Sequence, residues 1–318
     1  MFDRILVPLD GSSLAECVLP HAIAIAQAFD AQVTLLRVLE RTHGTALTQA
    51  INPLEWQLIK TEAEAYLNEV TARLQSFDIK VQKRLEEGQA AEHIIEFAHR
   101  NDIDLITLSS HGQSGLSGWN VSSIVQKIIL RAYTSTLIVR AYHSTPEDLV
   151  SFRYRQILVP LDGSRRAENV LPPTMILSRF FGCQLLLAQL ISKPEMPSRT
   201  PLTPGEIELI NQITERNLRE ATRYLDEIRF RSTEGVDTRL HISEGNSSAL
   251  HNLVELENVD LVVLSAHGHS GNPKWPYGSF TLSFIAYGTT PLLIVQDLSR
   301  EEVQKTAAEI AAREEKGH

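Results

Sequence analysis

The sequence has few cysteines and no long apolar segment. Its two cysteines, Cys17 and Cys183, are too few for a disulfide framework and lack the spacing of a metal site, so we expect both to be reduced core residues. The longest largely apolar segment, 185–191, is far too short to cross a bilayer. No signal-peptide pattern precedes the first strand-like segment, so the expected location is the cytoplasm, with no membrane partner.

Positive charge is also scarce. The 318 residues carry a formal net charge of −9, and no cluster of lysine or arginine stands out. Nucleic acids and anionic membranes require a basic surface, so neither is an expected partner. The apolar fraction of 43% and the charged fraction of 22% are typical of a globular protein that buries its own core.

The most informative feature is an internal repeat. Residues 4–22, RILVPLDGSSLAECVLPHA, return at 156–174 as QILVPLDGSRRAENVLPPT, with 13 of 19 positions identical. Residues 104–115, DLITLSSHGQSG, return at 260–271 as DLVVLSAHGHSG, with 8 of 12 positions identical. A period this long indicates two tandem domains of ordinary size. We expect them at 1–145 and 153–298, followed by a charged tail at 299–318.

In each half, short apolar runs alternate with segments of helical spacing. This alternation predicts an α/β fold with two doubly wound, five-stranded parallel sheets. The expected strands are 5–9, 32–39, 79–85, 104–108 and 137–139, then 157–161, 184–191, 237–242, 261–264 and 292–295. The expected helices are 14–29, 54–77, 90–99 and 123–133, then 167–181, 207–230, 249–256 and 279–287. Pro20 lies inside the first of these and predicts a kink or a later helix start.

Two glycine-containing turns in each half follow the first and fourth strands. The first pair is Asp10-Gly11-Ser12 and Asp162-Gly163-Ser164, and the second pair is Ser109–Gly112 and Ser265–Gly268. Since the carboxyl ends of parallel strands share one sheet edge, the two turns of a half are expected to face each other across a crevice. Glycine lets the backbone approach a phosphate, and a following helix start adds free N–H donors.

Each turn also has a purely structural interpretation. The aspartates could cap a turn or a helix, and glycine-serine turns are common without any ligand. His111 and His267 have no acid or nucleophile beside them in the sequence, so no catalytic role is expected. No metal-ligand spacing is present either.

Together, VPLDGS after the first strand, SSHGQSG or SAHGHSG after the fourth and a Gly-Ser helix start resemble the universal stress protein family. The likeness spans nearly the whole chain as a tandem of two domains. It implies a sheet order of 3-2-1-4-5 and an adenine nucleotide α-hydrolase-like fold. Nucleotide-binding members carry G-x-x-G, nine residues, then G-S/T, and hold ATP. The matching positions are Ser265, Gly268, Gly278 and Ser279 in the second half and Ser109, Gly112, Ser122 and Ser123 in the first. The resemblance also implies nucleoside contacts from Asp10 and Asp162 and adenine contacts from the backbone of Val38 and Leu190.

The resemblance implies a stress-response protein that binds ATP or another adenine nucleotide, with or without Mg²⁺. The nucleotide would act as a switch or structural ligand, with at most slow hydrolysis. Because the first half has lost more glycines, the second half is the expected site, with His267 also among its contacts, and the first half binds weakly or not at all. The alternatives are a protein-interaction module without nucleotide and, ranked last, an enzyme of the α-hydrolase type. Self-association is expected through the fifth strands, as an intramolecular pseudo-dimer and as a homodimer.

Overall fold

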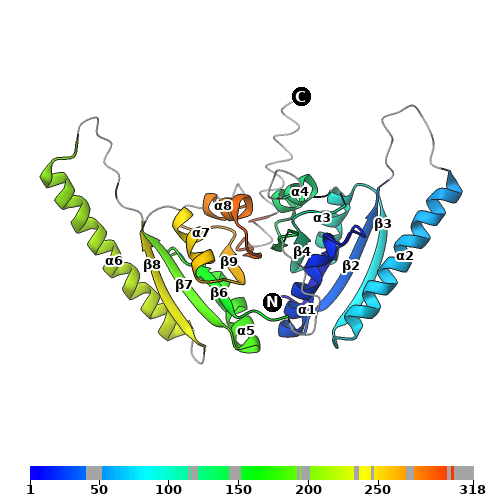
Figure 1. The fold of residues 1–318 in the computed structure, drawn as a ribbon, viewed down its shortest axis with the longest axis horizontal. Helices are drawn as coiled ribbons and strands as arrows, with labels where there is room; N and C mark the ends of the chain where they lie inside the picture. The colour runs from blue at the N-terminus through cyan, green and yellow to red at the C-terminus, as the bar shows by residue number, and fades with distance from the viewer. Residues whose placement is uncertain are drawn as a thin grey trace. The chain divides into compact units, whose positions relative to one another are not determined.

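The computed structural model describes residues 1–40, 52–113, 115, 121–142, 152–191, 194, 201–232, 236–244, 247–269, 276–298 and 302–303. Within them, strands and helices alternate along the chain (Figure 1). The contacts divide the chain into two compact units, Met1–Arg153 with Ile285–His318, and Tyr154–Phe284. Most of the expected tail, 299–318, lies outside the described residues.

The first unit is built around a mainly parallel sheet. Its elements are β1 (Arg4–Pro8), η1 (Ala15–Val18), α1 (Leu19–Phe29), β2 (Gln32–Leu39), α2 (Pro53–Gln75), β3 (Lys80–Glu87), α3 (Ala90–Arg100), β4 (Leu105–Ser109), α4 (Ser123–Ala132), β5 (Ser135–Val139) and β10 (Leu292–Val295). The strand order is β3-β2-β1-β4-β5-β10, which confirms the predicted order 3-2-1-4-5 for the first five strands. β10 pairs antiparallel with β5, so the two fifth strands of the repeat are neighbours.

The second unit repeats the pattern. It contains β6 (Gln156–Pro160), η2 (Ala167–Val170), α5 (Leu171–Phe181), β7 (Gln184–Ile191), α6 (Pro204–Ser232), β8 (Thr238–Glu244), α7 (Ser247–Leu256), β9 (Leu261–Ser265) and the start of α8 (Ser279–Tyr287). The strands lie in the order β9-β6-β7-β8 and are parallel. β6 and β9, whose following turns carry the predicted site residues, are therefore direct neighbours.

Burial explains why these segments take these forms. β4 and β9 are buried along their whole length, as expected for the centre of a parallel sheet. β3, in contrast, is an edge strand with exposed and half-buried side chains, and α2 lies along it (Figure 1). α2 turns one apolar stripe to the core, which includes Ala63, Leu67 and Leu74.

Proline sets where the first helix of each unit begins. Residues 15–18 form a 3₁₀ turn, and α1 starts only at Leu19, with Pro20 in its first turn. Proline fits there because the N–H groups of a first turn have no partner within the helix. The second unit repeats this with Pro172 at the start of α5. The later helix start predicted from Pro20 is thus confirmed.

Both cysteines are buried and free, as the sequence predicted. Burial raises the pKa of Cys17 and of Cys183 to about 11, so both thiols stay protonated and unreactive at neutral pH. Among the residues that the structure describes, no helix is long and apolar enough to span a bilayer.

Candidate functional site

In the second unit, Asp162 joins the turn after β6 to the turn after β9. Its Oδ1 accepts a hydrogen bond from the backbone N–H of Ser164 at 2.9 Å. Its Oδ2 accepts one from the backbone N–H of His269 at 2.6 Å, across 107 residues of chain. The prediction that these two turns face each other is therefore correct.

The close approach of Asp162 explains a glycine in the second turn. A Cβ atom built on Gly268 would lie 2.2 Å from Asp162 Oδ2, much closer than van der Waals contact allows. Any side chain at 268 would push the carboxylate away and weaken its bond to His269. A glycine at 268 is therefore explained by this contact within the protein, whatever ligand is present.

The two turns border a cavity of about 210 Å³. Its walls include all seven residues that the sequence predicted for the second half: Asp162, Leu190, Ser265, His267, Gly268, Gly278 and Ser279. The sequence missed seven further lining residues: Pro160, Leu161, Ala167, Leu250, Leu264, Phe280 and Thr281. Most of these are apolar. Pro160 and Leu161 lie within the repeated VPLDGS motif and could have been found, whereas Leu250 on α7 carries no local signal.

The start of α8 is fixed against the turn after β9. The N–H of Gly278 donates to the carbonyl of Ala266 at 2.8 Å, and Thr281 Oγ1 donates to the carbonyl of Ser265 at 2.9 Å. Ser279, Phe280 and Thr281 form the first turn of α8 and line the cavity. The N–H groups of a first helical turn have no acceptor within the helix, so they are available to an anion.

Gly278 differs from Gly268 because there is space beside it for a side chain. A Cβ atom built there would make only ordinary contacts, the nearest at 3.7 Å from the carbonyl oxygen of Ala266. Protein packing therefore does not require glycine at 278. Because glycine has no side chain, nothing at this position covers the first-turn N–H groups of α8 on the side that faces the cavity.

Ser265 brings a hydroxyl to the cavity wall. The residue is 7% exposed, and its Oγ has no hydrogen-bond partner among the residues that the structure describes. A buried polar group without a partner costs about 1–3 kcal/mol, so such groups often mark a ligand or water position. His267, on the same wall, is 1% exposed.

The first unit closes its two turns in the same way. Asp10 Oδ2 accepts a hydrogen bond from the N–H of Gln113 at 2.5 Å, and a Cβ atom built on Gly112 would lie 2.1 Å from that oxygen. Asp10 Oδ1 accepts from both the N–H and the hydroxyl of Ser12. The geometry around the two aspartates is thus shared by both copies.

The polar side chains around these turns differ between the copies. Ser109 Oγ lies 2.8 Å from the carbonyl oxygen of Leu14 and 2.6 Å from that of His111, so its hydroxyl is satisfied within the protein. Ser122 caps α4 by accepting a hydrogen bond from the N–H of Val125 at 3.4 Å. In the second unit the matching positions hold the unpartnered Ser265 hydroxyl and Gly278.

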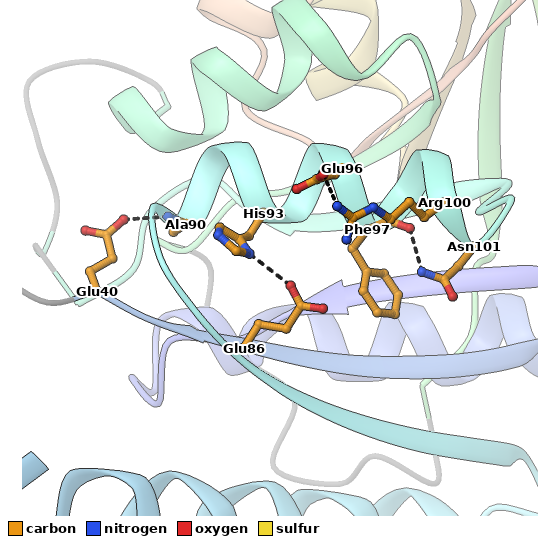
Figure 2. Close-up of polar contacts among 8 residues, drawn as sticks. All are labelled: Glu40, Glu86, Ala90, His93, Glu96, Phe97, Arg100 and Asn101. Atoms are coloured by element: carbon orange, nitrogen blue, oxygen red, sulfur yellow. Dashed lines mark hydrogen bonds and ion pairs between the residues drawn. The ribbon is translucent and has the colours of Figure 1, made fainter.

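The remaining predicted residues of the first unit lie near its sheet edge. Ser123 is the exposed first residue of α4. Val38 is paired in register with Glu86 of β3. Figure 2 shows Glu86 reaching His93 on α3, with Glu86 Oε2 3.0 Å from His93 Nδ1. Counted back from the repeated Asp-Leu at 104 and 260, Leu250 corresponds to Ile94, the buried residue next to His93. The first copy therefore keeps an apolar side chain at that position and adds the polar pair beside it.

A second contact in the same region orders the start of α3. Glu40 Oε1 accepts a hydrogen bond from the N–H of Ala90 at 2.6 Å (Figure 2). A carboxylate at a helix N-terminus satisfies a free donor and interacts favourably with the helix dipole. Here the protein's own anion occupies that position.

The residues present do not form a resident metal site. Among the described part of the chain, no group of three or more His, Cys, Asp or Glu side chains could hold a metal ion. Among the described residues that line the cavity, Asp162 is the one carboxylate, and each of its oxygens already accepts a backbone N–H. The described residues of the cavity wall thus offer too few oxygen ligands to hold Mg²⁺ by themselves.

Comparison with known proteins gives two matches along the chain. The model of the universal stress protein family matches residues 1–140 and 153–296. Universal stress protein MJ0531 of Methanocaldococcus jannaschii is 29% identical over 141 residues, covering 44% of this chain and 83% of that protein.

Solved structures resemble almost the full length. A universal stress protein from Archaeoglobus fulgidus has a TM-score of 0.63 at 16% identity, covering 94% of this chain and 100% of that chain. A Pseudomonas aeruginosa protein described as functionally unknown has a TM-score of 0.67 at 14% identity, covering 98% of each. At these identities the likeness shows a shared fold.

Proposed function

The chain belongs to the universal stress protein family as a tandem of two such domains, and on that basis we propose that its second domain binds an adenine nucleotide. The observation that carries the proposal is the cavity beside β6 and β9, whose walls include every second-domain residue singled out from the sequence. ATP is the ligand that the sequence resemblance implies. The proposed setting is a cytoplasmic stress response.

The cavity walls supply the contacts that a nucleotide needs. Leu190, Leu250 and Phe280 are apolar surfaces suited to a base. A carboxylate has about four acceptor positions, so Asp162 can still accept hydrogen bonds from ribose hydroxyls beyond its two backbone bonds. The first turn of α8 offers N–H donors and positive potential to phosphate.

The same walls lack the groups for rapid phosphoryl transfer. No lysine or arginine is among the described residues that line the cavity. Fast phosphoryl transfer depends on cations and metal ions that neutralise developing charge. We therefore assign the nucleotide a role as switch or structural ligand, with at most slow hydrolysis and with any Mg²⁺ held by the phosphates.

The test uses a pair of matched glycine substitutions. Freshly purified protein is denatured, and the released nucleotide is identified by mass spectrometry and quantified by absorbance. Gly268→Ala and Gly112→Ala each place a Cβ atom against an aspartate oxygen, at 2.2 and 2.1 Å respectively. Because the steric change is nearly identical, the first-domain variant controls for general effects on folding.

We expect Gly268→Ala to lose the nucleotide and Gly112→Ala to retain it. Asp162→Ala should also lose the nucleotide, because the ribose acceptor is removed. Wild-type protein that neither carries nor binds any adenine nucleotide would reject the proposal. Unchanged affinity in both the Gly268 and Asp162 variants would reject this site.

The alternative is a protein-interaction module, which one feature of the second domain favours. Phe230 on α6 is 91% exposed, and Leu218 on the same helix is 39% exposed. Both side chains line one surface hollow along α6, and contiguous exposed apolar patches are typical of a contact surface. Loss of a binding partner in Phe230→Ser, with wild-type protein free of nucleotide, would favour this function.

A further inference from the structure

We propose that the second-domain cavity is built for a nucleoside monophosphate, and that the second and third phosphates of ATP add nothing to its affinity. This inference rests on the proposed nucleotide-binding function and narrows its ligand class. Three properties of the cavity support it: its volume, the signs of the charges on its walls, and the hydroxyl of Ser265.

The volume is small for a nucleoside triphosphate. Pockets for drug-sized ligands usually measure about 300–1,000 Å³. The cavity beside β6 and β9 measures about 210 Å³. Such a space suits a base and ribose with one group extending toward the helix start, and it leaves no enclosed room for a phosphate chain.

The charges on the walls favour a single phosphate. Asp162 is negative, and no lysine or arginine is among the described residues that line the cavity. The start of α8 carries about half a positive charge, which suits one phosphate group. Further phosphates would add negative charge near Asp162 without any cation on these walls to neutralise it.

Ser265 independently indicates a polar ligand at this place. Its side chain is more than nine-tenths buried, it lines the cavity, and its Oγ has no partner among the described residues. The equivalent Ser109 hydroxyl already has a backbone carbonyl acceptor within the protein, at His111 or Leu14. A ligand oxygen that hydrogen-bonds to Ser265 would satisfy this hydroxyl on the cavity wall.

The side chain of Ser265 also narrows the space through which a phosphate chain would reach the turn after β9. The Cβ atom and the hydroxyl of Ser265 lie on the cavity wall beside this turn. Those atoms occupy part of the space through which a longer phosphate chain would pass close to the backbone. We therefore assign Ser265 as a specificity-determining residue of the cavity.

The experiment measures the affinities of nucleotide-free wild-type protein for adenosine, AMP, ADP and ATP by titration calorimetry. We expect AMP to bind about 30-fold more tightly than adenosine, because a hydrogen-bonded phosphate contributes about 2 kcal/mol, and we expect ADP and ATP to bind no more tightly than AMP. ATP binding at least threefold more tightly than AMP would overturn the inference, as would equal affinities for AMP and adenosine. If none of the four ligands binds, the proposed function itself fails.

Three variants separate the contribution of the Ser265 hydroxyl from that of its Cβ atom. Ser265→Ala should weaken AMP binding about fivefold, while Ser109→Ala, its first-domain counterpart, should leave it unchanged. Unaltered AMP affinity in Ser265→Ala would remove this hydroxyl from the site. Ser265→Gly should improve ATP relative to AMP, because it reopens the approach to the backbone.

A further variant tests for a cation from outside the described residues. Lys274 is the one lysine or arginine between Gly268 and Gly278 in the sequence, and it lies outside the described residues. Lys274→Ala should leave the ranking of the four ligands unchanged. An ATP preference in wild type that disappears in Lys274→Ala would show that the loop neutralises further phosphates, and it would overturn the inference.

Discussion

Substituting Gly278 by serine tests whether the start of α8 binds phosphate. Serine is the residue at the matching position of the first domain, Ser122, where its hydroxyl caps α4. In Gly278→Ser the new hydroxyl would accept a hydrogen bond from a first-turn N–H of α8. It would thereby compete with a phosphate for the same donor.

The structure indicates that this substitution leaves folding intact. A Cβ atom at 278 meets its nearest neighbour at 3.7 Å, which is ordinary van der Waals distance, and Gly278 is not among the glycines with positive φ. Serine and glycine differ by only a few tenths of a kcal/mol as N-caps. We therefore expect the free energy of unfolding in urea to change by less than about 0.5 kcal/mol.

The expected effect on binding is larger. A hydrogen bond to a charged group contributes about 1.5–3 kcal/mol, and partial loss of one such bond to phosphate should cost about 1–2 kcal/mol. This corresponds to a fall in AMP affinity of about 5- to 30-fold. Adenosine has no phosphate, so its affinity serves as the matched control and should not change.

Titration calorimetry of both ligands on wild type and Gly278→Ser decides the question. Equal weakening of AMP and adenosine would mean that serine blocks the cavity rather than the helix start. Full retention of AMP affinity would place the phosphate elsewhere. Either result would refute the assignment of the phosphate to α8.

Three predictions concern the scaffold. Leu67→Ala should lower the free energy of unfolding by about 2–5 kcal/mol, since Leu67 is 1% exposed on the core face of α2. An unchanged urea melt would contradict that packing. Arg140→Ala should lower the free energy of unfolding by about 3 kcal/mol, because the fully buried guanidinium donates from Nη1 and Nη2 to the carbonyl of Ile285 at 3.3 Å. Arg140→Lys, which keeps the charge, is the control and should lower it less. Burial lowers the pKa of His21 from 6.5 to about 3, so between these values only the unfolded chain gains the proton. Stability from this residue is complete above about pH 6.5 and is lost as pH falls toward 3. Phe in place of His21 should flatten the acid slope of stability measured by denaturant melts, and an unchanged slope would show that the neutral imidazole does not contribute.

Most of the fold could be predicted from the sequence because each strand and helix has its own local period. β7 and β10 have the predicted bounds, and the helix beginning at Ser279 was also placed correctly. The pairing of β10 with β5 had no local signal. It was expected only from the resemblance, since the residues of β10 are as apolar as those of any buried strand.

The site was predictable where a turn follows a strand and less so elsewhere. The sequence brought Asp162 and Gly268 to one sheet edge because parallel strands end there together. It could not show that Asp162 accepts the N–H of His269, since that bond depends on the exact spacing of two turns. Nor could it separate Leu250, a cavity-wall residue, from an ordinary core leucine.

The two domains show why equal motifs need not give equal sites. Ser109 and Ser265 follow equivalent strands, yet only the second leaves a hydroxyl without a partner in the described chain. A ligand in the first domain would exchange bonds that the protein already makes, so the net gain is small. In the second domain, a ligand that bonds to Ser265 removes a penalty of about 1–3 kcal/mol already present in the free protein. That difference amounts to roughly 5- to 150-fold in affinity and arises between copies whose backbone turns are almost the same. The second domain can therefore prefer a ligand without any change of fold, through the satisfaction of one buried hydroxyl and the absence of one capping side chain.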